Sequence, residues 1–270
     1  MNRLAFISLL SAATLFLVGC GNNEPAEEGT IMLGSIISQS TGKSYTFDYD
    51  RNYRPVKINH DEDDLSYIWT FSYESSNCMM KYVNRDVPSD NDTQTAWAAF
   101  LNGGIRDIKN ASGYIFTYDL KDNRVYVKHD VNNKLHYKFE YDENGDIQYI
   151  DKYTHHYENG DKVYDLLDCA VFEYTEYPDN LRFYRFNALD FTYEQNAPNG
   201  EFAMFLIGCV NATSQHLLKR SEYTNCIVKE YSYTFKNDRV DTITVETYDI
   251  TEGKKLLSTE VFNVNWILLS

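Results

Sequence analysis

A short unit recurs along this chain and constrains its fold more than any other feature. Each copy has alternating aromatic residues, a polar turn, an aliphatic residue and a second alternating stretch. Alternation puts every second side chain on one face, which is typical of a half-buried β-strand. Each copy therefore predicts a hairpin, and the series predicts an all-β, antiparallel meander of hairpins forming an open, curved sheet or a barrel. The copies are SYTFDYDRNYRPVKI from Ser44, GYIFTYDLKDNRVYV from Gly113, HYKFEYDENGDIQYI from His136, EYSYTFKNDRVDTITV from Glu230 and the degenerate VFEYTEYPDNLRFYRF from Val171.

The copy at His136 predicts a specific register. A three-residue loop over 143–145 pairs Tyr141 with Ile147 and Phe139 with Tyr149, which keeps the apolar residues on one face. The third loop position of such a hairpin favours a left-handed residue, and Gly145 occupies it. The same reasoning gives these pairs in other copies: Tyr118 with Val125, Asp119 with Arg124, and Phe235 with Val240.

The same turn contains acids at the spacing of a calcium loop. Asp142, Asn144 and Asp146 alternate like the first oxygen ligands of an EF-hand. That loop also needs a glycine one position later and a distant glutamate, and the other hairpin copies lack the alternating acids. The pattern therefore favours a plain turn, and no metal or other cofactor is predicted.

Two stretches break the strand pattern. TQTAWAAFL, Thr93–Leu101, and NATSQHLLK, Asn211–Lys219, each begin near a capping residue and predict short helical insertions. Such insertions would plug or cap the sheet. The closing run VFNVNWILLS, Val261–Ser270, predicts a last strand, because its large apolar residues are costly to expose.

The first residues predict export. A short positive start precedes an apolar run, Leu4–Val18, of 15 residues, which suits a secretory signal better than a membrane span. The following Leu17–Cys20 stretch resembles the lipobox of bacterial lipoproteins, in which the cysteine is lipidated and becomes the first residue. The expected organisation is a signal peptide over 1–19, lipidated Cys20 with an acidic tether over 20–30, and one hairpin-repeat domain over 31–270. Lipid chains would hold the protein to a membrane surface.

The repeat resembles a class of Bacteroidetes lipoproteins that carry a porin-like, open β-barrel domain of unknown function. Their units have the form Tyr-x-Phe-x-Tyr-Asp-x-x-Gly-Arg-x-x-x-Ile. Here the closest residues are Tyr45-Phe47-Tyr49-Asp50 and Phe116-Tyr118-Asp119-Arg124. The resemblance implies a porin-like fold and a lipid-anchored location at the outer membrane. It leaves open the periplasmic or cell-surface side, and it carries no catalytic residues over to this chain.

Four cysteines remain after Cys20. They are Cys78, Cys169, Cys209 and Cys226. Export makes a disulfide chemically feasible, and Cys209–Cys226 is the candidate pair because it closes a short loop. Buried free thiols are the alternative, and the sequence does not decide between the two.

Charge and motifs narrow the function. The formal net charge is −15, so the chain repels phosphate backbones and nucleic acid is not a predicted partner. The sequence has no GxSxG elbow, P-loop, GxGxxG after a strand, or HExxH. His156 and Glu158 share a strand face next to His155, a pattern that favours solvated surface over a metal site. The acidic run over 60–64 predicts an exposed loop.

Three functions remain open. The first is a non-catalytic binding or scaffold lipoprotein of the cell envelope, with a glycan or an envelope protein as its partner. The 23 tyrosines motivate it, since aromatic surfaces bind sugars and proteins, although they would equally fill a curved sheet. The second is a glycan hydrolase with an unidentified carboxylate pair. The third is a periplasmic structural or assembly factor. Missing motifs favour a protein that is not an enzyme, without deciding the point.

Overall fold

The alternating stretches form strands throughout the part of the chain that can be described. The computed structural model describes residues 30–62, 65–75, 77–84, 94–101, 104–109, 115–122, 124–129, 135–181, 183, 186–188, 191 and 214–269. These residues contain sixteen strands: β1 Thr30–Ser38, β2 Ser44–Tyr49, β3 Pro55–Glu62, β4 Leu65–Tyr73, β5 Asn77–Asn84, β6 Gln94–Leu101, β7 Gly104–Lys109, β8 Ile115–Lys121, β9 Arg124–His129, β10 Leu135–Tyr141, β11 Ile147–Glu158, β12 Asp161–Pro178, β13 His216–Tyr223, β14 Ile227–Lys236, β15 Arg239–Asp249 and β16 Lys255–Leu269.

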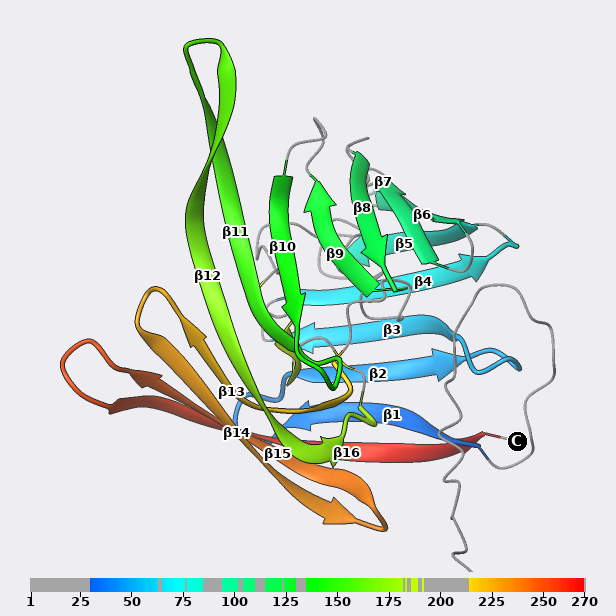
Figure 1. Ribbon diagram of the computed structural model, residues 1–270. Helices are drawn as coiled ribbons and strands as arrows, with labels where there is room; N and C mark the ends of the chain where they lie inside the picture. The colour runs from blue at the N-terminus through cyan, green and yellow to red at the C-terminus, as the bar shows by residue number, and fades with distance from the viewer. Residues whose placement is uncertain are drawn as a thin grey trace, which may run out of the picture.

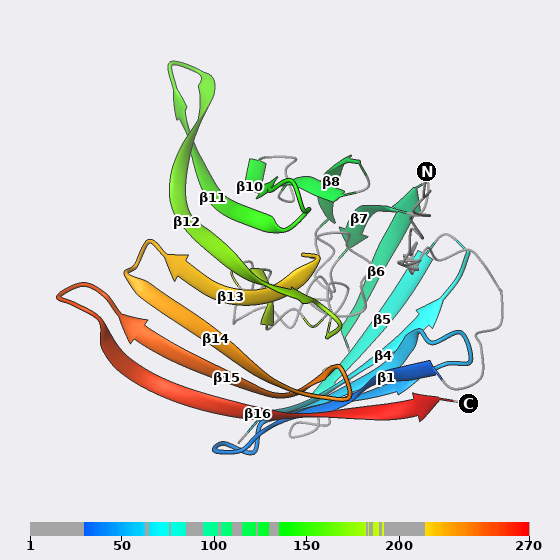
Figure 2. The same ribbon diagram turned by 60° about the horizontal axis from the view of Figure 1, so that its bottom comes forward.

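The strands form one antiparallel meander that closes on itself. Each strand pairs with the next along the chain, and the long β11–β12 hairpin extends beyond the rest (Figure 1). Ile36 of β1 lies opposite Tyr45 of β2 on one side and Val264 of β16 on the other. Figure 2 shows the sheet curving round between these first and last strands. The predicted all-β antiparallel meander is confirmed, and of the two expected architectures the described strands adopt the barrel.

Alternation decides which side chains face the interior. On β2, Tyr45 and Phe47 are buried whereas Asp48 is exposed. The same pattern on other strands joins their apolar side chains into one buried cluster, which includes Ile58, Trp69, Phe71, Met80, Phe139, Ile147, Ile150, Ile243 and Phe262. Full burial of one such side chain stabilises a protein by about 1.5–3 kcal/mol. The interior is therefore an apolar core.

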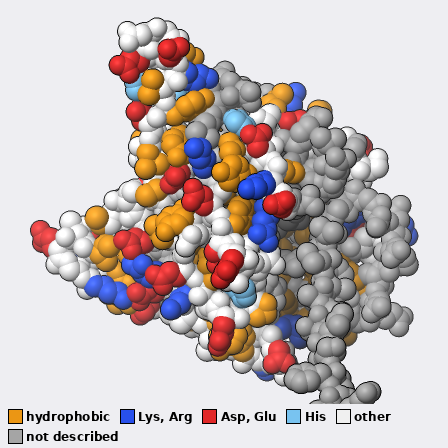
Figure 3. Space-filling model, in the orientation of Figure 1, with side chains coloured by type: hydrophobic (Ala, Val, Ile, Leu, Met, Phe, Trp, Pro, Cys, Tyr) orange, Lys and Arg blue, Asp and Glu red, His pale blue; other side chains and the backbone are white. Residues whose placement is uncertain are grey.

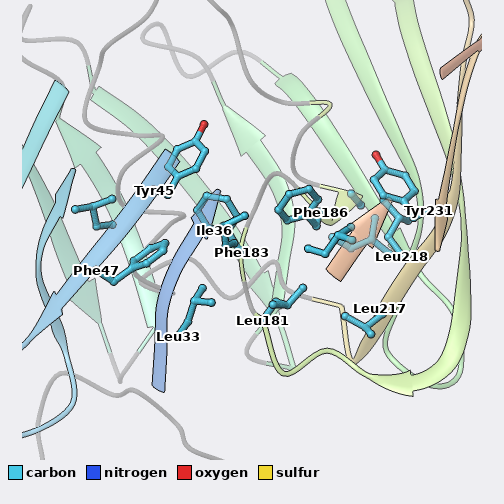
Figure 4. Packing of buried hydrophobic residues seen from close by; sticks show 14 of the residues in the cluster. Leu33, Ile36, Tyr45, Phe47, Leu181, Phe183, Phe186, Leu217, Leu218 and Tyr231 are labelled. Atoms are coloured by element: carbon cyan, nitrogen blue, oxygen red, sulfur yellow. The ribbon is translucent and has the colours of Figure 1, made fainter. Parts of the chain in front are cut away.

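Part of that core comes from the connection between β12 and β13. We call the described residues of this connection, 179–181, 183, 186–188, 191 and 214–215, the inner segment. Figure 4 shows Leu181, Phe183 and Phe186 lying between side chains of β1–β2 and those of β13–β14. The Phe183 ring lies 4.8 Å from the ring of Tyr45 and 5.6 Å from that of Phe47, both edge-on. The inner segment therefore fills the barrel from within.

Six β-bulges in the described strands share one hydrogen-bonding arrangement. In each, a strand carries one extra residue, and an aromatic side chain on the following strand donates a hydrogen bond to the carbonyl just before that residue. A bulge disrupts the ladder locally, and a buried carbonyl needs a donor. The bonds, of 2.6–2.8 Å, are Tyr49 to Leu33, Tyr73 to Pro55, Tyr141 to Val125, Tyr174 to Ile147, Tyr233 to Leu218 and Trp266 to Val240.

These hydrogen bonds give a structural role to tyrosines of the repeated aromatic stretches. Burial raises the pKa of the hydroxyls of Tyr49, Tyr141, Tyr174 and Tyr233, so they remain protonated donors. Of the two interpretations that the sequence allowed for tyrosine, the hydroxyls of these residues follow the second, because they complete the hydrogen bonding of the curved sheet.

Tyr49→Phe tests the hydrogen bond to a bulge carbonyl. We expect the free energy of unfolding to fall by about 1–2 kcal/mol, because the Leu33 carbonyl loses its donor in a partly buried site. Tyr126→Phe is the control, since Tyr126 is 45% exposed and its change should stay within about 0.5 kcal/mol. Urea denaturation measures both variants, and equal effects would contradict the role of the bulge carbonyl.

The bulges also correct the predicted registers. Tyr141 lies opposite Ile147 as predicted, but Gln148 is an extra residue, so Phe139 lies opposite Ile150 and not Tyr149. Ile150 is consequently buried and Tyr149 is exposed.

The other two predicted turns had different outcomes. Phe235 lies opposite Val240, as predicted. In the β8–β9 hairpin the prediction was wrong, because the turn is tighter: Lys121 pairs with Arg124 and Leu120 with Val125. Tyr118 then lies opposite Lys128, and Asp119 opposite Val127.

Both predicted helical insertions are wrong in the described residues. Gln94–Leu101 is strand β6, hydrogen-bonded to β5 and β7, and 216–219 belong to β13. Pairing of β6 on both edges overrides the helix propensity of its alanines. Ala98 of β6 is fully buried. The predicted return strand in the copy at Val171 is also wrong, because Leu181, Phe183 and Phe186 belong to the inner segment. The predicted last strand is confirmed as part of β16.

The predicted signal peptide, Cys20 and the tether up to position 29 lie outside the described residues, and Thr30, the last position of the predicted tether, begins the first strand. Among the described residues, no helix is long and apolar enough to cross a membrane. The three described cysteines, Cys78, Cys169 and Cys226, form no disulfide with one another. Cys209 lies outside the described residues, so the Cys209–Cys226 pair remains a prediction.

Candidate functional site

A cavity of about 400 Å³ lies where the β10–β11 turn meets β12 and the beginning of β13. The turn contributes the acids that the sequence singled out as a calcium-like pattern. The lining residues are Asp142, Asn144, Asp146, Gln148, Phe172, Glu173, Tyr174, Thr175, Glu176 and His216. On the face that Figure 3 shows, acidic and basic side chains of the described residues are interspersed with apolar ones.

The turn is held by its first acid. One carboxylate oxygen of Asp142, Oδ1, accepts the backbone N–H groups of Asn144 and Asp146, each at 2.9 Å. Gly145 has a φ of 89°, which confirms the predicted left-handed position. The Arg124 guanidinium packs directly against this glycine. The hairpin interpretation of the stretch is therefore correct for its backbone.

Asp146 has a larger role than a turn residue. Its side chain is 2% exposed, and Oδ1 accepts the backbone N–H groups of Gln215 at 2.6 Å and His216 at 2.9 Å. Its Oδ2 lies 2.6 Å from Nδ1 of His216. The carboxylate therefore fixes the start of β13 to the β10–β11 turn. The sequence pattern favoured a plain turn, and it did not indicate that Asp146 is buried and bonded to a distant strand.

A second set of hydrogen bonds lies beside Asp146. The Ser214 hydroxyl accepts the backbone N–H of Ile147 at 3.2 Å and donates to the Tyr174 oxygen at 2.7 Å. Tyr174 in turn donates to the Ile147 carbonyl at 2.8 Å. Burial raises the pKa of the Tyr174 hydroxyl well above its usual value, and the nearby Asp146 carboxylate adds to that effect. Tyr174 thus stays neutral at the wall of the cavity.

The cavity is acidic. Its lining includes four carboxylates, Asp142, Asp146, Glu173 and Glu176, and neither lysine nor arginine is among the lining residues. Arg220 lies next to it and pairs with Glu173 at 3.2 Å and with Glu222 at 2.5 Å. The local charge favours a neutral or cationic ligand over an anionic one.

Serine, histidine and aspartate meet here, yet their geometry differs from that of a hydrolytic triad. In a triad the serine hydroxyl donates to the histidine that the aspartate orients. Here the Ser214 hydroxyl donates to Tyr174, and Ser214 is only 4% exposed. The His216–Asp146 pair therefore serves to hold β13, and the described residues contain no group of three or more His, Cys, Asp or Glu side chains placed to hold a metal ion.

The other residues noted in the sequence lie away from the cavity lining. His156 pairs with Asp165 across the β11–β12 hairpin at 2.6 Å, with both side chains 51% exposed. The predicted exposed loop over 60–64 is wrong for 60–62, which belong to β3. The His60 ring is buried and stacks on that of Tyr45 at 4.4 Å. Positions 63 and 64 lie outside the described residues.

One sequence signal could have identified the cavity. The residue before the aliphatic position of the return strand is arginine in three hairpins, at Arg54, Arg124 and Arg239. At β10–β11 it is Asp146. A local departure from a repeat marks a position where function or an unusual contact has overridden the pattern.

Gly145→Ala tests the contact between the turn and Arg124. A Cβ at this position would clash with the guanidinium, so Arg124 must leave the Tyr141 ring over which it lies at 5.4 Å. We expect a loss of about 1–2 kcal/mol from the positive φ together with this displacement. Gly160→Ala is the matched control, since its φ is 92° and nothing lies within 4 Å of its added Cβ. Equal thermal shifts would contradict a role for the Arg124 contact.

Comparison with known proteins supports the fold. No protein-family model and no curated protein sequence matches the chain. It resembles the crystal structure of a porin-like protein from Bacteroides uniformis, with a TM-score of 0.50 and 10% identity over 90% of this chain and 99% of that one. It also resembles a porin-like protein from Bacteroides vulgatus, with a TM-score of 0.52 and 13% identity over 87% and 98%. At these identities the likeness shows a porin-like β-fold.

Proposed function

We propose that this protein is a non-catalytic binding lipoprotein of the cell envelope, anchored to the outer membrane through Cys20, that binds a glycan or an envelope protein. The observation that carries the proposal is the cavity at the β10–β11 turn. Its volume, about 400 Å³, is within the usual range for ligand sites, and its wall combines charged, amide, hydroxyl and imidazole groups.

The apolar interior argues against a conducting pore. Transmembrane channels of this kind have polar side chains facing the lumen and apolar side chains facing lipid. Here the inward side chains of the described strands form the apolar core, and the inner segment fills it. A ligand would thus bind at a surface cavity and would not pass through the barrel.

Fatty-acid labelling tests the anchor. Cys20→Ala should abolish incorporation of a labelled fatty acid and release the protein from membranes, because lipid chains supply the membrane affinity. Protease shaving of intact cells then separates a surface binding protein from a periplasmic structural or assembly factor. Membrane retention of unlabelled Cys20→Ala protein would overturn the anchoring proposal.

A hydrolase is the alternative that one observation favours. The cavity gathers Asp142, Glu173 and Glu176, and glycoside hydrolysis needs two carboxylates at one site. Against it, Glu173 is paired with Arg220, and Asp142 holds the turn. Incubation with cell-envelope glycans, followed by mass spectrometry of the products and saturation-transfer NMR of the mixture, distinguishes the two. Binding without conversion supports the proposal, whereas conversion that is lost in Glu176→Gln would establish the hydrolase.

A further inference from the structure

Two turns of the barrel have the same backbone. In the β2–β3 turn, Asp50 Oδ1 accepts the N–H groups of Asn52 and Arg54 at 2.9 and 3.0 Å, and the Asp50 N–H donates to the Arg54 carbonyl. In the β10–β11 turn, Asp142 makes the same three bonds with Asn144 and Asp146. Asp50 is therefore equivalent to Asp142, and position 54 to position 146.

The two turns differ in what lies over them. The Arg54 guanidinium bonds the second oxygen of Asp50 through Nε at 2.9 Å and Nη2 at 2.7 Å. It also lies over the Tyr73 ring at 4.4 Å. Tyr73 is the tyrosine that donates to the bulge carbonyl of this hairpin. Arg54 thus lies between the carboxylate of the turn and the tyrosine that donates to the bulge carbonyl, which we call the bulge tyrosine.

The neighbouring hairpin has a related arrangement. In β8–β9 the equivalent arginine, Arg124, lies over the ring of Tyr141, which donates to the bulge carbonyl at Val125. Placement of a guanidinium on a bulge tyrosine is therefore repeated within this barrel.

At β10–β11 the carboxylate and the tyrosine are present without the arginine. Asp142 and Tyr174 correspond to Asp50 and Tyr73, and both line the cavity. Asp146 replaces the arginine, and its carboxylate is bonded to β13. We propose that this cavity binds a guanidinium group from a ligand, as in an arginine side chain, between Asp142 and Tyr174. The inference rests on the proposed binding function and specifies the chemistry of its ligand.

Charge and shape support a guanidinium. The lining has four carboxylates and no lysine or arginine, so a cation is attracted. A guanidinium is planar, stacks on aromatic rings and bonds a carboxylate through a fork, whereas an ammonium is a more strongly hydrated point charge. The cavity volume of about 400 Å³ also leaves room for the aliphatic stem of the side chain.

Calorimetry with blocked amino acids tests the inference on the full chain in detergent. The probes are Nα-acetyl-arginine methylamide, its citrulline counterpart, which has the same shape without the charge, and its lysine counterpart. We expect the arginine probe to bind at least about tenfold more tightly than either of the others, because only it supplies both the charge and the planar fork. Free L-arginine as a fourth probe distinguishes a small-molecule source from a protein source.

Asp142→Asn provides the decisive variant. Asparagine keeps the oxygen that holds the turn and removes the charge, so the melting temperature should change little while arginine binding weakens about tenfold or more. Asp50→Asn is the matched control: it makes the same change in the equivalent turn and should leave arginine binding unchanged. Equal binding of the arginine and citrulline probes, or arginine binding in Asp142→Asn equal to that of the unmodified chain, would overturn the inference.

The outcome can be separated from that of the proposed function. If the arginine probe does not bind while lipid labelling and glycan binding are observed, the guanidinium inference is wrong and the proposed binding lipoprotein stands. If the arginine probe binds but Cys20 is not lipid-labelled, the proposed membrane anchor is wrong and the guanidinium site stands.

Discussion

Replacing Phe183 with alanine should lower the free energy of unfolding by about 3–5 kcal/mol, the usual loss for a large aromatic side chain removed from a core. Phe183 is 1% exposed and belongs to the inner segment. Its ring contacts those of Tyr45 and Phe47 on β2 and lies 5.8 Å from that of Phe186. The substitution would leave a cavity inside the barrel, because sixteen paired strands cannot collapse onto the vacated space.

Chemical denaturation followed by tryptophan fluorescence measures this effect, since Trp69 belongs to the same buried cluster. Tyr157→Ala is the control, because Tyr157 lies on the protruding β11–β12 hairpin and is 64% exposed. Its effect should be below about 1 kcal/mol. A loss for Phe183→Ala no greater than that of the control would show that the inner segment contributes little to the core.

Asp146→Ala should cost about 2–4 kcal/mol. The substitution removes the acceptor of two backbone N–H groups, from Gln215 and His216, and leaves the His216 imidazole without its carboxylate. A buried donor without an acceptor costs about 1–3 kcal/mol. Glu143→Ala in the same turn is the control, since Glu143 is exposed and its loss should change stability by less than about 0.5 kcal/mol.

Thermal melts with and without millimolar calcium complete this test. Both oxygens of Asp146 already accept hydrogen bonds, so calcium should leave the melting temperature unchanged. A ligand that binds only the folded state would raise stability by RT ln(1 + [L]/Kd). A calcium-dependent rise that is absent in Asp146→Ala would show that the turn is a metal site, and equal stability of Asp146→Ala and Glu143→Ala would contradict the anchoring role.

The candidate site was only partly predictable. The sequence indicated the turn at 142–146 and the left-handed Gly145. It did not indicate that Asp146 is buried, because the groups that bury it, Gln215 and His216, lie 69 and 70 residues further along the chain. Only folding brings them to the turn.

The sequence by itself determined the class of fold, because alternation with a period of two and a polar turn in each repeat specify hairpins through local geometry. It also determined the last strand and the Tyr141–Ile147 pair. The tertiary structure decided the closed barrel, the position of each bulge and the burial of Phe183. The copy at Val171 predicted a return strand, yet Leu181, Phe183 and Phe186 pack inside the barrel instead. The β6 strand illustrates the same limit, since Ala98 favours a helix locally and becomes strand only through its neighbours. These choices depend on contacts between residues distant in sequence, which no local pattern contains.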